Sequence, residues 1–253
     1  MAGATSFSFG VIADVQWADQ DDGTNYDKTV RRCYRGALKT LQNAGALLRL
    51  DPTTSGLQPN AALSVYHPNP ELTRSRPTLA ASWWSGHRGS EAPAFIAQLG
   101  DLIDGKNAQL GQSESALDAA LAALSGVACP KIHLLGNHEL YNFNRKQCAE
   151  RLNTAPSGKE FYSTVPAPGF RVVVLDSFRE SIILPQTGSD TARKEIASSA
   201  CFQRTLALLR ANNPNDVLSN ANWLAGLSGT ARRFMPFNGG LGAEQQEWFR
   251  AEL

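Results

Sequence analysis

Three short apolar runs each end abruptly in polar residues, and this pattern constrains the fold more than any other feature of the sequence. Residues 7–13 (FSFGVIA), 94–100 (AFIAQLG) and 131–135 (KIHLL) have the length and β-prone content of buried strands. The residues that follow them are Asp14-Val15-Gln16, Asp101-Leu102-Ile103-Asp104 and Gly136-Asn137-His138-Glu139. Polar residues directly after buried strands are typical of a site at the carboxyl edge of a parallel sheet.

Other segments of the sequence have the apolar periodicity of helices. Apolar spacing predicts helices over residues 27–50, 113–124, 145–152, 193–211 and 242–253. Residues 161–165 and 170–175 predict two further strands. The alternation of strands and helices indicates an α/β fold with a largely parallel sheet. We expect a single domain over residues 1–253, with insertions at about 51–93 and 177–240.

Composition and charge exclude several classes of function. Of the 253 residues, 42% are hydrophobic and 19% are charged, and the net charge is +1. This balance does not favour binding to nucleic acid or to a membrane surface. Neither a membrane span nor a secretory signal is visible. We therefore expect a cytoplasmic protein, monomeric by default.

The cysteines support the same location. Their positions (Cys33, Cys129, Cys148 and Cys201) form neither a zinc-ribbon spacing nor a disulfide framework. We expect them to be reduced and mostly buried.

The side chains of the three motifs are of the types that bind metals. Asp, Gln and Asn offer oxygen and His offers nitrogen, and an oxygen-rich set suits Mg²⁺ and Mn²⁺. Each motif alone has a plainer interpretation, since Asp14 could cap a turn and Asn137-His138 could form a hydrogen-bonded turn. All three in order, each after an apolar strand, favour a metal site.

The set D-x-Q, G-D-x-x-D and G-N-H-E resembles that of the calcineurin-like metallophosphoesterases. Gln16, residues 100–105 and Tyr141-Asn142-Phe143 make the sequence most similar to the manganese-dependent ADP-ribose/CDP-alcohol diphosphatases. The resemblance implies a metallophosphoesterase-like αββα sandwich. It also implies hydrolysis of the diphosphate linkage of a small nucleotide-linked substrate such as ADP-ribose or CDP-choline.

The resemblance further implies which residues hold two divalent metal ions. Asp14 and Gln16 would bind the first metal, Asp101 would bridge both, and Asn137 would bind the second. Two metals can clamp the attacking and leaving oxygens of a displacement. The family's first motif has either His or Gln at this position, and Gln16 places a neutral oxygen donor there in place of nitrogen, which favours Mn²⁺, with Mg²⁺ as the second candidate.

The remaining roles implied by the resemblance surround the metals. His138 would face the phosphate and stabilise developing charge or protonate the leaving oxygen. Asp104 and Glu139 would hold the ligands in place. The residues implied in substrate contact are Tyr141, Asn142 and Phe143.

The resemblance is incomplete on the C-terminal side. The family also has a lone His and then a Gly-His-x-His motif, whereas the four histidines of this chain all precede Asp176. Among them, His133 lies within a predicted strand and is expected in the core. We interpret the chain as lacking the C-terminal part of the domain. We therefore expect weak Mn²⁺ binding and little or no turnover from the 253 residues alone.

Two alternatives stay open. The chain could be another metallophosphoesterase that acts on a phosphomonoester, a cyclic nucleotide or a phosphoprotein. It could also be a catalytically inactive binding module or fragment of the same fold. The absent histidines favour inactivity, while the intact motif residues favour an enzyme.

Overall fold

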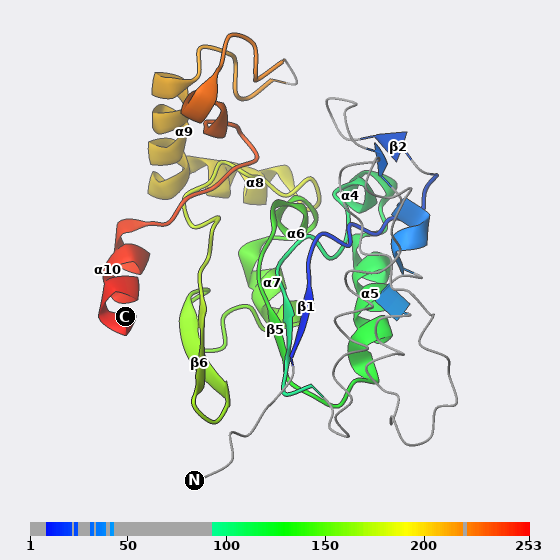
Figure 1. Cartoon of the computed structure of the whole chain (residues 1–253). Helices are drawn as coiled ribbons and strands as arrows, with labels where there is room; N and C mark the ends of the chain where they lie inside the picture. Colours follow the sequence, from blue (N-terminus) through cyan, green and yellow to red (C-terminus); the bar gives the residue numbers. More distant parts are fainter. Residues whose placement is uncertain are drawn as a thin grey trace. The chain divides into compact units, whose positions relative to one another are not determined.

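The structure is a computed structural model that describes residues 9–21, 23–24, 31–32, 34–38, 41–42, 93–219 and 222–253 (Figure 1). The chain divides into two compact units. The first comprises Met1–Gln98 with Leu102–Ile132, and the second comprises Leu99–Asp101 with His133–Leu253. A single domain over residues 1–253 stays a prediction, and the predicted insertion at 51–93 lies, except for Pro93, outside the described residues.

A three-stranded sheet carries the predicted motifs. Its strands are β1 (Gly10–Ile12), β4 (Ile96–Gln98) and β5 (Lys131–His133), in the order β1-β4-β5. β1 and β4 run parallel, with Gly10 opposite Ile96. All three strands are shorter than the apolar runs that predicted them, but each lies within its run. The parallel pairing agrees with the predicted α/β class, and His133 is buried, as expected.

The pairing of β1 with β4 resumes beyond the motifs. An isolated parallel bridge joins Trp17 to Ile103 in the same register as the strand pairs. Trp17 N–H donates to the Leu102 carbonyl at 3.4 Å, and Asp104 N–H donates to the Trp17 carbonyl at 2.9 Å. Two strand segments with one register therefore flank the first motif.

Two helices follow in the first unit. They are α4 (Lys106–Leu110) and α5 (Ser113–Ser125). α5 matches the predicted helix, and its small apolar face, including Ala116, Leu117 and Ala120, is buried. α4 was not predicted, because its five residues are too few to show a helical period.

The predicted helix over residues 27–50 is wrong at its start. Arg31–Arg32 forms β3, which pairs antiparallel with β2 (Gly23–Thr24). Residues 34–38 and 41–42 are helical, and Tyr34 and Leu41 are buried as the apolar spacing predicts. Helix propensity at residues 31–32 is a weak preference, and the backbone hydrogen bonds of a strand pair override it.

The second unit begins with two helices and a hairpin. α6 (Asn137–Asn142) and α7 (Arg145–Leu152) precede the antiparallel strands β6 (Tyr162–Ala167) and β7 (Phe170–Val174). α7 has the predicted bounds, because the Asn144 side chain accepts from Gln147 N–H and the Gln147 side chain accepts from Asn144 N–H.

The later helices pack around a small apolar core. The single helix predicted over residues 193–211 is two helices, α8 (Asp190–Ser198) and α9 (Ala200–Asn212). The break comes at Ser199, whose hydroxyl caps α9 by accepting from Phe202 N–H. A short 3₁₀ helix (Gly229–Arg233) and α10 (Ala243–Glu252) follow. The core comprises Ile182, Phe202, Leu206, Leu209 and Val217.

The described cysteines are unpaired thiols, as expected. Cys129, Cys148 and Cys201 are free, and Cys33 lies outside the described residues. Burial raises the pKa of Cys148 to about 12, so the thiol is neutral at physiological pH. Cys129 and Cys201 are only half-buried, which is less burial than the sequence led us to expect.

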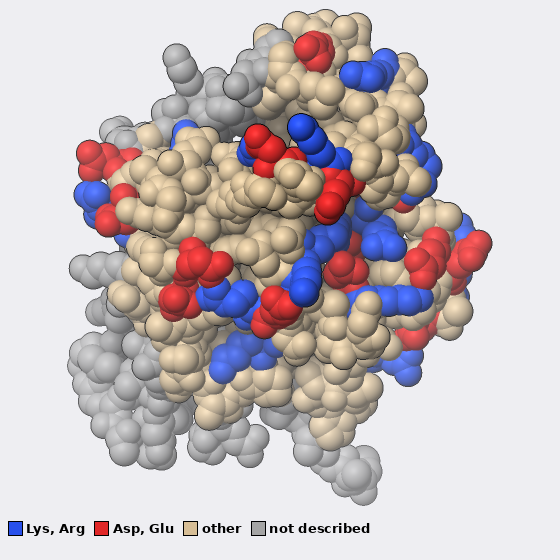
Figure 2. Space-filling model, turned by 180° about the vertical axis from the view of Figure 1, so that it is seen from behind, with Lys and Arg blue, Asp and Glu red and all other residues tan. Residues whose placement is uncertain are grey.

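Charges on the surface are mixed in sign. On the face shown in Figure 2, Lys and Arg lie among Asp and Glu. In the part of the chain that the structure describes, no helix has both the length and the apolar character needed to cross a membrane.

Candidate metal centre

The backbone at three predicted ligands adopts a conformation that non-glycine residues rarely adopt. Asp14, Gln16 and Asp101 have φ angles of 52°, 49° and 57°. This left-handed region costs an L-residue roughly 1–2 kcal/mol. Within the described ranges, the other non-glycine residue with positive φ is Asn153, which ends α7. Left-handed non-glycine residues persist where the surrounding structure imposes them, and they gather at functional sites.

The first unit holds two predicted ligands of the first metal, Asp14 and Gln16. Asp14 is exposed and Gln16 is buried, and the Gln16 Nε2 donates to Asp14 Oδ1 at 3.3 Å. The two side chains therefore lie together on one turn after β1. Asp104 is buried close to this turn in the fold, since its N–H donates to the Trp17 carbonyl and its Oδ1 accepts from Lys106 N–H at 2.8 Å.

The second unit joins the second and third motifs through Glu139. This side chain is fully buried, and its Oε2 accepts from the N–H groups of both Asp101 and Gly136, each at 2.8 Å. Asp101 Oδ1 in turn accepts from His138 N–H at 3.0 Å. A single carboxylate thus fixes the turn that carries Asp101 against the start of α6, which carries Asn137 and His138.

The two motif turns approach so closely that only glycine fits between them. A Cβ on Gly136 would lie 2.0 Å from Asp101 Oδ1 and 2.6 Å from Asp101 N. A Cβ on Gly100, which has φ +101°, would lie 2.6 Å from Gly136 N. The glycines of G-D-x-x-D and G-N-H-E are therefore required by the close approach of these two backbones.

α6 presents the predicted catalytic histidine, His138. Its ring meets the Tyr141 ring edge-on, with 5.5 Å between centroids. Both side chains are half-buried, whereas Asn142 and Phe143 are buried. The Asn142 amide donates to the His138 carbonyl at 2.9 Å. Of the three predicted substrate contacts, Tyr141 therefore packs its ring against the His138 ring, and Asn142 contacts the His138 backbone.

The end of α6 is fastened by two residues that sequence reasoning missed. Gln186 N–H donates to the Tyr141 carbonyl at 2.8 Å, and Thr187 Oγ1 donates to the Asn142 carbonyl at 2.6 Å. Both residues lie in the predicted insertion at 177–240. No local pattern marks them, because their partners lie about 45 residues earlier in the chain.

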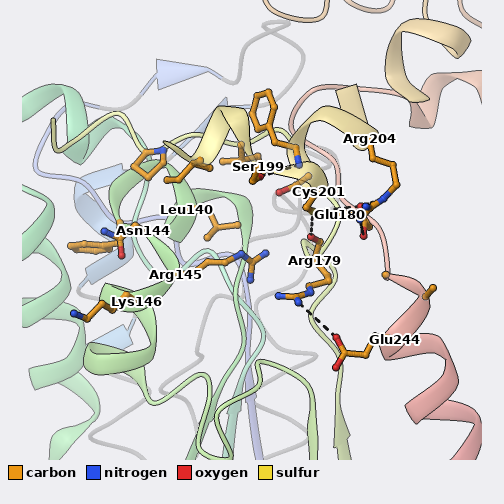
Figure 3. Close-up of a pocket in the computed structure, with 18 residues that line it drawn as sticks. Leu140, Asn144, Arg145, Lys146, Arg179, Glu180, Ser199, Cys201, Arg204 and Glu244 are labelled. Carbon is orange, nitrogen blue, oxygen red and sulfur yellow. Dashed lines mark hydrogen bonds and ion pairs between the residues drawn. The ribbon is translucent and has the colours of Figure 1, made fainter. Parts of the chain in front are cut away.

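A cavity of about 810 Å³ opens beside the end of α6 in the second unit (Figure 3). Its walls include the apolar side chains of Leu140, Phe143, Ile183 and Phe202. The charged groups around it form ion pairs within the unit. Arg204 binds Glu180 in a two-point contact, and Arg179 lies 3.8 Å from Glu244.

Arg145 connects this region to the segment that follows β7. Its Nη1 lies 2.8 Å from Asp176 Oδ2, and its Nη2 donates to the Phe178 carbonyl at 2.5 Å. The Gln245 side chain pairs with the backbone of Asp176, accepting from its N–H at 2.7 Å and donating to its carbonyl at 3.0 Å. Burial alone would lower the pKa of Arg145, but the charges of Asp176 and Glu160 outweigh it and leave the pKa raised.

The donor set fits hard or borderline divalent cations. The four predicted ligands are two carboxylates and two amides, and each contributes oxygen. Among the described residues, no group of three or more His, Cys, Asp or Glu side chains is placed to bind a metal. Asp14 and Gln16 belong to the first unit, and Asp101, Asn137 and His138 belong to the second.

Comparison with known proteins identifies relatives over nearly the whole chain. The manganese-dependent ADP-ribose/CDP-alcohol diphosphatase of Bos taurus is 33% identical over 262 aligned positions, which cover 98% of this chain and 62% of that protein. The Homo sapiens protein of the same name is 32% identical, with 98% and 61% covered. This chain thus spans less than two thirds of the length of either relative. No family model matches the chain.

A solved structure shows the same fold. The crystal structure of a dimetal phosphatase from Danio rerio matches 98% of this chain and 64% of its own length, with 31% identity and a TM-score of 0.69. The resemblance drawn from the three motifs is confirmed by these relatives. The predicted metallophosphoesterase-like α/β fold is confirmed by this structure.

Proposed function

Because this chain is homologous, over nearly its whole length, to the manganese-dependent ADP-ribose/CDP-alcohol diphosphatases, we propose that it provides the metal-binding turns of a two-metal diphosphatase. The preferred ion is Mn²⁺. The substrate is a small nucleotide-linked diphosphate of the ADP-ribose or CDP-alcohol kind, and the bond cleaved is the diphosphate linkage.

The proposed ligands come from three turns. Asp14 and Gln16 bind the first metal, Asp101 bridges the two, and Asn137 binds the second. When bound, two such ions lower the pKa of water and neutralise charge on the phosphate oxygens. Asp101 is held for this role, because its N–H is bonded to Glu139 and its Oδ1 to the His138 N–H.

His138 is the proposed proton donor to the leaving oxygen. Its backbone is fixed at both ends, by Asp101 through the N–H and by Asn142 through the carbonyl. The edge contact with Tyr141 limits rotation of the imidazole. The ring is therefore held near the Asp101 turn, where a general acid would act on a phosphate. Glu139 and Asp104 are proposed to position the turns and to bind no metal.

The left-handed backbone at Asp14, Gln16 and Asp101 is the observation that carries this proposal. Aspartate tolerates this conformation in ordinary turns, but glutamine does so rarely, so Gln16 in particular is hard to explain by folding alone, and all three residues coincide with proposed ligands. Metal coordination gives a reason for this backbone conformation at the three residues.

Metal binding by the purified chain tests the site. Titration with Mn²⁺, followed by the loss of the free-ion electron paramagnetic resonance signal, should show saturable binding. Asp101→Asn should weaken this binding at least tenfold. The matched control is Asp190→Asn, which changes an exposed carboxylate paired with Arg193 and should leave binding unchanged. Equal Mn²⁺ binding by the wild type and Asp101→Asn would refute the site.

A substrate panel tests the reaction and its rivals. ADP-ribose, CDP-choline, a cyclic nucleotide and p-nitrophenyl phosphate are compared at millimolar Mn²⁺ over long incubations, so that slow turnover is still ranked. We expect the two diphosphates to be cleaved fastest, with the rate abolished by Asp101→Asn. Preference for p-nitrophenyl phosphate or the cyclic nucleotide would identify another phosphoesterase. Saturable ADP-ribose binding without any turnover would identify a binding module.

A further inference from the structure

The turn that carries Asp14 and Gln16 is strained, and something outside it must hold it. Both residues are left-handed, with φ of 52° and 49°. The Gln16–Asp14 hydrogen bond, at 3.3 Å, is long and lies within the turn. On the C-terminal side, Trp17 is the first residue that returns to regular pairing, through its bridge to Ile103. Trp17 therefore anchors the C-terminal end of the turn that carries Gln16.

The Asn107 side chain holds the backbone of Trp17. It lies on α4 and is fully buried. Its Nδ2 donates to the Trp17 carbonyl at 2.7 Å and to the Asp104 carbonyl at 2.9 Å. The Trp17 carbonyl also accepts from Asp104 N–H. One amide group thus ties the residue after Gln16 to the end of the G-D-x-x-D motif, and all these residues belong to the first unit.

The two contacts fix the orientation of the Asn107 amide. Both partners are carbonyl oxygens, so the NH₂ group must face them and Oδ1 must point away. Among the described residues, this buried Oδ1 has no hydrogen-bond partner. An unsatisfied buried acceptor is a cost to the fold, which the two donated bonds have to offset. An apolar residue of similar size would avoid that cost but would leave the Trp17 carbonyl with only the hydrogen bond from Asp104 N–H.

We propose that Asn107 is a positioning residue for the first metal site, because its amide locks the backbone that presents Asp14 and Gln16. The inference rests on the proposed metal site. Asn107 binds no metal itself and acts only through Trp17 and Asp104. Without it, the strained turn relaxes and the two ligands lose their preset geometry.

Asn107→Leu is the direct test, since leucine fills a similar volume but donates no hydrogen bond. In the purified chain, we expect the Mn²⁺ dissociation constant to rise about 10- to 100-fold, as for other residues that orient metal ligands. Asn107→Ser, which keeps a short hydroxyl donor, should give a smaller loss. It also serves as the test if the leucine variant does not fold.

The matched control is Asn213→Leu. Asn213 is also a buried asparagine whose Nδ2 donates to two backbone carbonyls, those of Trp223 and Phe234 at 3.1 and 2.7 Å. It lies in the second unit, outside the proposed site. Asn213→Leu should lower the melting temperature of the metal-free chain about as much as Asn107→Leu does, while Mn²⁺ affinity stays at the wild-type value.

A double-mutant cycle separates positioning from general stability. Asn107→Leu should weaken Mn²⁺ binding strongly in the wild type but by less than threefold in an Asp14→Asn background, because the ligand that it positions is already impaired. The proposal would be overturned if Asn107→Leu weakened Mn²⁺ binding equally in the two backgrounds. It would also be overturned if Asn213→Leu weakened Mn²⁺ binding as much as Asn107→Leu does. If Asp14→Asn and Asp101→Asn themselves leave Mn²⁺ binding unchanged, the proposed function fails instead.

Discussion

Glu139 accepts a hydrogen bond from the backbone N–H of Asp101, at 2.8 Å and across 38 residues of sequence. The same oxygen accepts from the Gly136 N–H at 2.8 Å. One buried carboxylate therefore sets the distance between two turns that carry proposed metal ligands. The hydrogen bonds are charge-assisted and shielded from water, and such bonds are the strongest that side chains make to backbone.

Replacing Glu139 by leucine should destabilise the chain by about 3–5 kcal/mol, because two buried N–H groups lose a charged acceptor. Glu139→Gln, which keeps one acceptor oxygen, should cost about 1 kcal/mol. Urea unfolding without metal measures both. Gln147→Leu is the control. Gln147 is the third residue of α7, as Glu139 is of α6, and its side chain accepts from one N–H, that of Asn144, at 3.0 Å. A Glu139→Leu cost no larger than that of Gln147→Leu would contradict the prediction.

Gly136→Ala should disrupt the site by sterics alone. The new methyl group would lie 2.0 Å from Asp101 Oδ1, so either the carboxylate or the start of α6 must move. We expect a loss of at least 3 kcal/mol, roughly the upper range for overpacking, and loss of Mn²⁺ binding. Gly240→Ala is the comparison, because its added Cβ would meet Glu180 Cβ at an ordinary 3.9 Å. Wild-type metal affinity in Gly136→Ala would show that the two turns are not tightly coupled.

Arg145→Met should be among the most destabilising charge changes in the second unit. The Asp176 side chain is fully buried and lies 2.8 Å from Arg145 Nη1, so removal of the cation leaves a buried carboxylate without its ion pair. The expected cost is about 3 kcal/mol, read from the midpoint of urea unfolding. Arg204→Met removes a cation that is 61% exposed, and because water screens such a pair its loss should shift the midpoint far less. Similar unfolding midpoints for the two variants would contradict the expected cost of leaving the buried Asp176 carboxylate without its ion pair.

The Glu180–Arg204 pair should make stability depend on pH in acid. Burial raises the pKa of Glu180, but hydrogen bonds from Arg204, Cys201 and Thr205, with the Arg204 charge, outweigh burial and leave the pKa below its ordinary value of 4.5. A lowered folded-state pKa contributes stability above the unfolded-state pKa, and that stability is lost as pH falls through the folded-state pKa.

The measurement is thermal unfolding of the wild type and Glu180→Gln from pH 7 to pH 3. Below about pH 4.5, the wild type should lose its advantage over the variant as Glu180 is protonated. Above that pH the difference between the two melting temperatures should be constant. A constant difference over the whole range would show that the pair does not lower the pKa of Glu180.

Much of the secondary structure and the candidate site could be predicted because it depends on near neighbours in the chain. The bounds of α7 follow from Asn144 and Gln147, three residues apart, which cap each other. The apolar runs before the three polar motifs located β1, β4 and β5, although each strand ends one or two residues before its run does. In contrast, the apolar period continues through Ser199, so the break between α8 and α9 did not show in the sequence.

The sequence by itself determined the α/β class, the positions of the three motif-bearing strands and the identity of the ligand-type residues, since these are properties of short stretches of chain. Only the tertiary structure decided how the turns are held. It gives Asp101 its left-handed backbone. The bond of Asp101 to Glu139 joins residues 38 positions apart, and the contact of Asn107 with Trp17 joins residues 90 positions apart. The energies of these contacts depend on which turns lie together in the folded chain. A pattern within one segment of the sequence cannot show that.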